Sequence, residues 1–186
     1  HAEWMQQVTH KDCCGAMPGR EAREAAWDAQ SAMAAAADGN EELVVALLDY
    51  YKFFDSFEPR FYARFLSDTG IHPQFVNLFL DLNTKAVRRV KISGVYSESF
   101  TTFNAHGQGD PVTLMLALLY VTVQFRLHDE QCPDLGKSAV VDDRSLHGKC
   151  KPVEGAFEKI QAFDDMAGHI TQPSKLVLLA IGKVAK

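Results

Sequence analysis

Short apolar runs and longer segments of helical spacing alternate along the chain. Runs such as residues 43–49 and 138–141 are bounded by polar residues and have the length of strands buried on both faces. Between residues 86 and 103, apolar and polar positions alternate around Ser93-Gly94, which predicts a hairpin. The predicted strands are residues 43–49, 86–92, 96–103, 138–141, 145–149 (weakly marked) and 176–181.

Helical segments separate these strands. Residues 21–37 are rich in Ala, Glu and Gln, which favour helices, and the DGN sequence at residues 38–40 ends the segment. Pro111 suits the first turn of an apolar helix, and Gly168 suits the C-terminal end of a later one. The predicted helices are residues 21–37, 58–67, 73–82, 111–125 and 154–166. This order of elements predicts an α+β domain with a mainly antiparallel sheet packed on helices.

Composition limits the classes of protein to which the chain can belong. Its 186 residues, 47% of them hydrophobic, suit one globular domain with a substantial core. Its longest apolar run, residues 111–125, is too short for a membrane span and predicts a buried helix. The N-terminus has neither a signal peptide nor an initiator Met, so we expect the chain to be cut from something longer. A formal net charge of −5 argues against tight nucleic-acid binding by this segment alone.

The four cysteines are expected to be reduced thiols, because no CxxC pair and no secretory signal is found. They are Cys13, Cys14, Cys132 and Cys150. A zinc site formed by the first two cysteines and His10 is an alternative, although the spacing is not that of a typical zinc motif.

Carboxylates at the ends of two apolar runs give the sequence a chemical interpretation. Asp49 follows one run, and Asp142 and Asp143 follow another about ninety residues later. If both strands end at the same edge of a sheet, the three side chains repel one another unless a cation binds between them. Mg²⁺ prefers such oxygen ligands, and a pair of ions can stabilise both oxygens of a phosphoryl transfer. The alternative is that Asp142 and Asp143 are ordinary turn residues and that Asp49 caps a helix.

Five segments in order resemble the motifs of reverse transcriptases, specifically those of the non-LTR retrotransposon and group II intron branch. The resemblance covers about residues 12–182, and its strength lies in the order and spacing of the motifs. The segments are residues 48–56 (LDYYKFFDS), 92–100 (ISGVYSESF), 107–113 (GQGDPVT), 140–143 (VVDD) and 168–175 (GHITQPSK).

The resemblance implies a catalytic role for four of these residues. Asp49 and Asp142 would bridge two Mg²⁺ ions, with Mn²⁺ as an alternative, and Asp143 would bind or tune the same metals. Lys175 would donate a proton to the departing pyrophosphate. For Lys175, an exposed surface lysine is the alternative interpretation.

Four further residues are implied in substrate binding. Phe54 would be a steric gate that excludes a 2′-hydroxyl, although a core aromatic is the alternative. Gln108 and Gly109 would contact the template base or the incoming nucleotide, unless they form an ordinary strand-to-helix loop. Arg20 would approach template or backbone phosphates, unless it is an exposed loop arginine.

The resemblance therefore predicts a polymerase palm, at residues 41–186, preceded by part of the fingers at residues 1–40, with no thumb. The expected function is DNA synthesis on an RNA template, using a DNA primer and deoxynucleoside triphosphates, with this segment inactive by itself. A non-catalytic relic that at most binds nucleic acid is the alternative, and an RNA-directed RNA polymerase is a weaker one, against which Phe54 speaks. We expect an intracellular, nuclear location and no membrane association.

Overall fold

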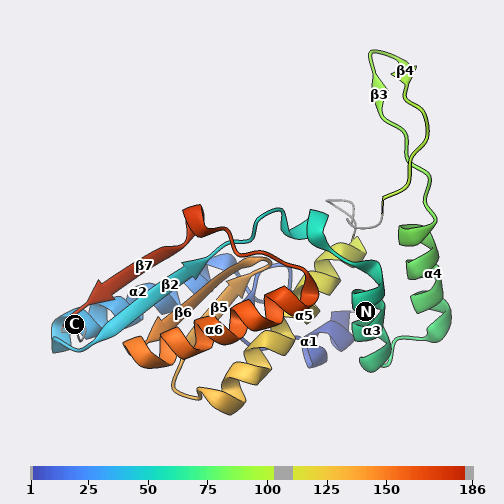
Figure 1. Ribbon diagram of the computed structural model, residues 1–186. Helices are drawn as coiled ribbons and strands as arrows, with labels where there is room; N and C mark the ends of the chain where they lie inside the picture. The colour runs from blue at the N-terminus through green and yellow to red at the C-terminus, as the bar shows by residue number, and fades with distance from the viewer. Residues whose placement is uncertain (1, 103–110, 183–186) are drawn as a thin grey trace.

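A five-stranded sheet forms the centre of the molecule, with the strand order β1-β5-β6-β2-β7 (Figure 1). The computed structural model describes residues 2–102 and 111–182. β1 runs parallel to β5, and the other neighbouring pairs are antiparallel, so the mainly antiparallel sheet is confirmed. The strands of this sheet are β1 (Cys13–Cys14), β2 (Leu43–Leu48), β5 (Gly136–Val140), β6 (Asp143–Gly148) and β7 (Val177–Ile181).

Helices cover both faces of the sheet. α2 contacts all five strands from one side, and the buried Val45 of β2 belongs to the core between them. α6 contacts β2 and β6 from the other side, where Ala46 and Leu48 are buried. Alternate strand residues face opposite ways, which explains why Val45 and Ala46 belong to different cores. The helices are α1 (Ala2–Val8), α2 (Ala22–Gly39), α3 (Pro59–Asp68), α4 (Pro73–Thr84), α5 (Pro111–Gln131) and α6 (Cys150–Ala167), with 3₁₀ turns η1 (Phe53–Ser56) and η2 (Pro173–Lys175).

A larger core, rich in aromatic side chains, lies beyond the ends of β2 and β6. It joins η1, α3, α4 and α5, and its fully buried members include Phe57, Tyr62, Tyr120 and Phe125. This core fixes the chain that leaves β2, so it holds one end of the sheet against the helices.

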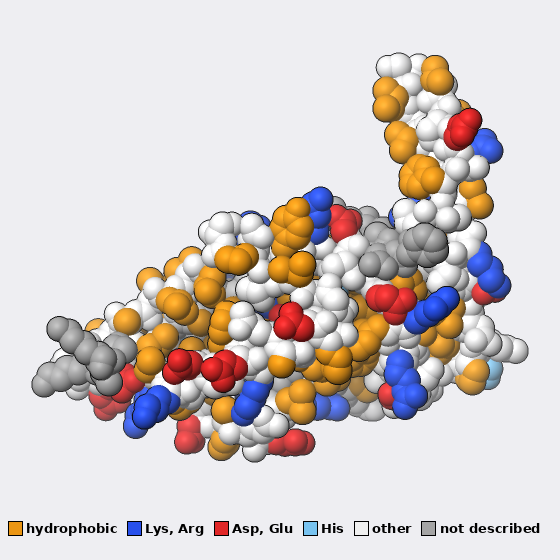
Figure 2. Space-filling model, in the orientation of Figure 1, with side chains coloured by type: hydrophobic (Ala, Val, Ile, Leu, Met, Phe, Trp, Pro, Cys, Tyr) orange, Lys and Arg blue, Asp and Glu red, His pale blue; other side chains and the backbone are white. Residues whose placement is uncertain are grey.

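A hairpin of β3 (Lys91–Ile92) and β4 (Val95–Tyr96) projects from this body (Figure 1). The predicted hairpin is confirmed, with a shorter paired region than the sequence pattern indicated and one further bridge between Arg88 and Phe100. Its apolar side chains are exposed, as Figure 2 shows.

The remaining differences from the predicted elements have physical causes. β1 is only two residues long, so it offers no periodicity, and it forms by pairing with β5. β6 was weakly predicted because Arg144 and Ser145 are polar, yet it lies inside the sheet with both residues buried. Residues 1–40, expected to be part of the fingers, contain β1, which belongs to the sheet, and α2, which packs on one face of it. Among the helices described, none is long and apolar enough to cross a membrane.

Candidate functional site

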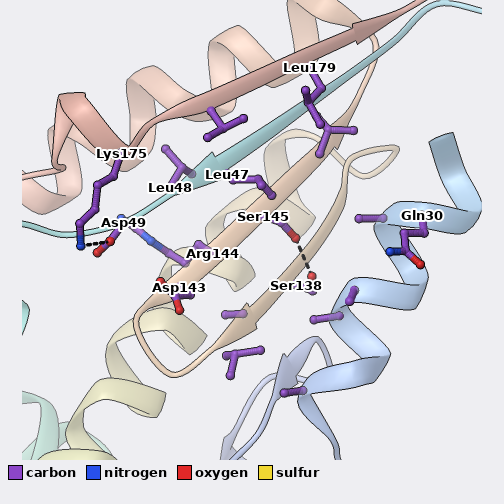
Figure 3. Close-up of a pocket in the computed structure, with 18 of the residues that line it drawn as sticks. Gln30, Leu47, Leu48, Asp49, Ser138, Asp143, Arg144, Ser145, Lys175 and Leu179 are labelled. Atoms are coloured by element: carbon purple, nitrogen blue, oxygen red, sulfur yellow. Dashed lines mark hydrogen bonds and ion pairs between the residues drawn. The ribbon is translucent and has the colours of Figure 1, made fainter.

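Two of the predicted carboxylates occupy neighbouring positions at one end of the sheet. Leu48, the last residue of β2, pairs with Arg144 of β6 in the antiparallel register. Asp49 therefore follows this pair on one strand, and Asp143 precedes it on the other. Figure 3 shows both side chains at this end of the two strands. The expectation that the two apolar runs deliver carboxylates to a common edge agrees with this geometry.

The third carboxylate lies in the turn between β5 and β6. Val140 pairs with Asp143, so Val141 and Asp142 are the two central residues of a tight hairpin. Val141 has a φ of 60°, which glycine normally adopts and which strains a β-branched residue. Strained backbone of this kind clusters at functional sites, because the surrounding structure must hold it in place.

A cavity of about 670 Å³ opens between α2 and the sheet beside these carboxylates (Figure 3). Its walls are mostly apolar, with alanines of α2 on one side and Leu47 and Leu179 of the sheet on the other. Asp49, Asp143 and Lys175 also line it. The cavity thus combines apolar walls with a charged end.

Lys175 reaches the first carboxylate from a separate segment of the chain. Its Nζ lies 2.5 Å from Oδ2 of Asp49, and its side chain is exposed. The backbone N–H of Gln172 donates to the carbonyl of Asp49 at 2.8 Å, which anchors the segment that carries Lys175. The hydrogen bond from Lys175 to Asp49, with the carboxylate's charge, raises the pKa of the lysine, so it carries a proton at neutral pH.

The carboxylates influence one another electrostatically. Burial raises the pKa of Asp142 above its ordinary value, and the charges of Asp143 and Asp49 raise it further. Burial, followed by the charge of Asp49, also raises the pKa of Asp143. Asp142 and Asp143 are therefore harder to ionise than isolated carboxyl groups, and a bound cation would relieve this cost.

The arrangement is not a closed metal cage. Across residues 2–102 and 111–182, no group of three or more His, Cys, Asp or Glu side chains is placed to hold a metal ion by itself. Mg²⁺ usually takes only one or two carboxylates and completes its shell with water and substrate phosphates. Asp49, Asp142 and Asp143 offer oxygen ligands only, so this donor set fits Mg²⁺ in that open mode.

Behind the carboxylates, on the face covered by α5 and α6, lies a buried polar network that sequence reasoning missed. Asp164 of α6 is 2% exposed. It accepts hydrogen bonds from the hydroxyl groups of Tyr50 (2.8 Å) and Tyr120 (2.7 Å) and from Nε2 of Gln124 (2.6 Å). Arg144 forms an ion pair with it at 3.3 Å.

Two signals in the sequence pointed to this network. Asp164 lies four residues after the buried Ile160, hence on the inner face of its helix. Gln124 interrupts an apolar helix, where a polar side chain needs a buried partner.

Phe54 lies in η1, five residues after Asp49, and is partly buried. Its ring stacks on that of Phe57, with 5.9 Å between the ring centroids, and meets that of Phe53 edge-on, with 5.3 Å between the centroids. The ring thus belongs to the rim of the aromatic core. Gln108 and Gly109, expected to contact the template base or the incoming nucleotide, lie outside the described residues.

Arg20 is tied to the backbone of its own segment. Its Nη1 donates to the carbonyl of His10 at 2.5 Å and, more weakly, to that of Cys13 at 3.4 Å. These bonds stabilise the loop before α2. A contact with template phosphates stays a prediction.

The cysteine pair gives no support to a zinc site. Burial raises the pKa of Cys13 to about 12, which disfavours the thiolate that zinc requires. Nε2 of His10 instead donates to Oδ2 of Asp129 at 2.7 Å.

Comparison with known proteins identifies the fold. No family model matches the chain, and no curated protein is significantly similar to it in sequence. Its structure is similar to that of apo telomerase from Candida tropicalis truncated from the C-terminal domain, with a TM-score of 0.74 and 12% identity over 99% of this chain.

Two telomerases in complex with the TWJ fragment of telomeric RNA are also similar. The Candida tropicalis complex has a TM-score of 0.69 and 11% identity, and the match covers 92% of this chain and 30% of the telomerase chain. The Candida albicans complex has a TM-score of 0.65 and 9% identity, and the match covers 96% of this chain and 34% of the telomerase chain. The chain spans 40% of the truncated telomerase. It therefore has a reverse-transcriptase-like fold, and the likeness does not assign it to the non-LTR or group II branch.

Proposed function

We propose that the chain is the palm, with part of the fingers, of an RNA-directed DNA polymerase that uses two Mg²⁺ ions. The observation that carries this proposal is the placement of Asp49 and Asp143 beside the paired residues Leu48 and Arg144, with Asp142 in the adjoining turn. In a reverse-transcriptase-like fold, carboxylates at this point are suited to metal-assisted transfer of a nucleotide.

The metal-binding residues would be Asp49, Asp142 and Asp143. When bound, the two ions would stabilise the charge on the attacking and leaving oxygens of the nucleotidyl transfer. Burial, followed by the charges of neighbouring carboxylates, raises the pKa values of Asp142 and Asp143, and a bound cation would favour their ionised forms. Mn²⁺ would satisfy the same oxygen donors.

Lys175 would act as the proton donor. It is exposed at the rim of the cavity, and its pairing with Asp49 keeps it protonated. Released from Asp49, the lysine would turn toward the phosphates of a bound nucleotide. It can then protonate the leaving pyrophosphate, which is general acid catalysis.

Phe54 would select the sugar, and Gln108, Gly109 and Arg20 would contact the nucleotide and the template. The order of the sequence motifs supports these assignments, and it also supports the retrotransposon or group II intron affiliation. The RNA bound by two of the similar telomerases supports an RNA template for this chain. A DNA primer and deoxynucleoside triphosphates complete the proposed reaction, and a nuclear location would suit it.

A non-catalytic relic is the competing proposal. It is not favoured, because a relic has no need to keep Asp142 and Asp143 with raised pKa values beside a strained turn and Asp49 at the end of the neighbouring strand. The similar telomerases are longer than this chain, so activity is expected only when the remaining fingers and a thumb hold the primer and template in reactive geometry.

The test is extension of a DNA primer on an RNA template. The chain lengthened by the sequence that flanks it in its gene should incorporate deoxynucleotides with Mg²⁺, and the 186-residue chain should not. A lengthened chain that binds primer and template but incorporates nothing, with its aspartates intact, would favour the relic.

A further inference from the structure

The buried ion pair between Arg144 and Asp164 lies directly behind the carboxylates. The side chain of Arg144 is fully buried, and its guanidinium carbon lies 3.8 Å from the centre of the Tyr50 ring. Its Nη1 also donates to Oε1 of Gln124 at 2.8 Å. Arg144 directly follows Asp143 in the chain, and Tyr50 directly follows Asp49.

Asp164 joins three segments of the site through its two oxygens. The hydroxyl of Tyr50 attaches the end of β2, and Arg144 attaches the start of β6. The hydroxyl of Thr171 donates to Oδ2 at 3.4 Å and attaches the segment that leads to Lys175. Each attachment is made one to four residues from a proposed catalytic side chain.

Stability alone does not explain a buried ion pair. The cost of removing two charges from water offsets most of their attraction, and apolar residues of similar volume are often as stable or better. Within the described part of the chain, Nε of Arg144 has no hydrogen-bond partner, which adds to that cost. What the pair does supply is a fixed relative position for the segments that it joins.

We propose that Arg144 and Asp164 are positioning residues that hold Asp49, Asp143 and Lys175 in one geometry from behind the sheet. This inference rests on the proposed function for its catalytic consequence. The positioning itself is a property of the folded chain, so it can be measured without any reaction.

The test uses the 186-residue chain and a charge-neutral replacement, Arg144→Met with Asp164→Asn. Asparagine keeps an oxygen for the two tyrosine hydroxyls, and methionine fills much of the space of the arginine. The matched control makes the same two changes in the exposed pair of Arg64 and Asp68 on α3, which lie 2.9 Å apart.

Hydrogen exchange is followed at two backbone amides, those of Tyr51 and Gln172. The amide of Tyr51 donates to the carbonyl of Ile170 at 2.8 Å, and that of Gln172 donates to the carbonyl of Asp49. Both bonds join the residues that directly follow β2 to the segment that carries Lys175.

In the neutral double variant, the melting temperature should stay within a few degrees of that of the natural chain, while exchange at both amides rises about tenfold or more. In the lengthened chain, kcat for primer extension should fall about 10²-fold at an unchanged affinity for primer and template. The surface control should leave the exchange at both amides and kcat for primer extension unchanged.

Unchanged exchange at both amides in a folded double variant would overturn the inference and leave the pair as part of the core. If the double variant does not fold, Arg144→Lys gives the same test. Lysine keeps the positive charge but cannot donate to Gln124 and Asp164 at the same time from two guanidinium nitrogens. A lengthened chain that carries its aspartates intact but does not extend a primer would refute the proposed function, and the exchange result would still decide the positioning role.

Discussion

The ammonium group of Lys175 lies 2.5 Å from a carboxylate oxygen of Asp49, although 126 positions separate the two residues in the chain. A cation of the protein thus occupies one of the oxygens that the proposed function assigns to a metal ion. The pairing neutralises Asp49 while the other two carboxylates remain without such a partner among the salt bridges of the described residues.

Replacing Lys175 with Met should raise the affinity of the chain for Mn²⁺ severalfold, because the metal no longer competes with the ammonium group for Asp49. The same change should lower kcat for primer extension, since the proton donor is lost. Mn²⁺ binding is measured by electron paramagnetic resonance. Lys85→Met is the matched control, because Lys85 forms a similar exposed pair with Asp81 at 2.7 Å. Weaker Mn²⁺ binding by the Lys175 variant would contradict the competition.

Replacing Asp142 and Asp143 with Asn should stabilise the folded chain at neutral pH. Both groups have a folded pKa above the ordinary 3.8, so folding disfavours their ionised forms, and stability is lost as the pH rises above that value. The melting temperature should rise by no more than about 2–4 °C, because both carboxyl groups are partly solvated. Thermal unfolding at pH 7 and at pH 3 measures the effect, which should disappear at the lower pH. A lower melting temperature at pH 7 would show that the carboxylates stabilise the fold.

Two buried histidines should make the chain sensitive to acid. Burial lowers the pKa of His169 to about 3 and that of His128 to about 4. The two histidines take up protons near pH 6.5 in the unfolded chain, but only near pH 3 and pH 4 in the folded chain. The free energy of unfolding therefore falls as the pH drops from 6.5 toward these lower pKa values. Each histidine should remove about 2 kcal/mol of stability at pH 5 relative to pH 7. Urea unfolding across this range measures the slope.

His169→Gln is expected to be less stable than the natural chain at pH 7, because it disturbs the bonds to Tyr62 (2.5 Å) and Ser56 (2.6 Å). Its stability should nevertheless depend less on pH between 6.5 and 5. An unchanged slope would show that His169 is not the titrating group.

Phe54→Val in the lengthened chain should increase incorporation of ribonucleotides relative to deoxynucleotides by about tenfold or more, because a smaller side chain leaves space for a 2′-hydroxyl. Competition between the two nucleotides in primer extension measures the ratio. Phe61→Val is the control, since Phe61 is also a partly buried aromatic at the rim of the same core. An unchanged ratio would assign Phe54 to the core alone.

The convergence of the strands that carry Asp49 and Asp143 could be predicted because its causes are local. The apolar runs of β2 and β5 have strand length and are each followed by carboxylates, and β6, which carries Asp143, returns from β5 through a two-residue turn. The pairing of Arg144 with Asp164 could not be predicted in the same way, because it joins a strand to a helix twenty residues later and depends on how the two pack.

The same distinction explains the other omissions. β1 becomes a strand only because β5 lies beside it, and Lys175 reaches Asp49 only through the fold.

The proposed role of the carboxylates at the ends of β2 and β6 is catalysis of nucleotide addition. Its most direct test is the rate of a single incorporation on an RNA template by the lengthened chain carrying Asp49→Asn, with Asp165→Asn on the exposed face of α6 as the control. We expect the Asp49 variant to bind primer and template normally and to incorporate at least about 10³-fold more slowly, as expected for loss of a metal-binding carboxylate, whereas the Asp165 variant keeps the natural rate. Equal rates for the Asp49 variant and the natural chain would contradict the account.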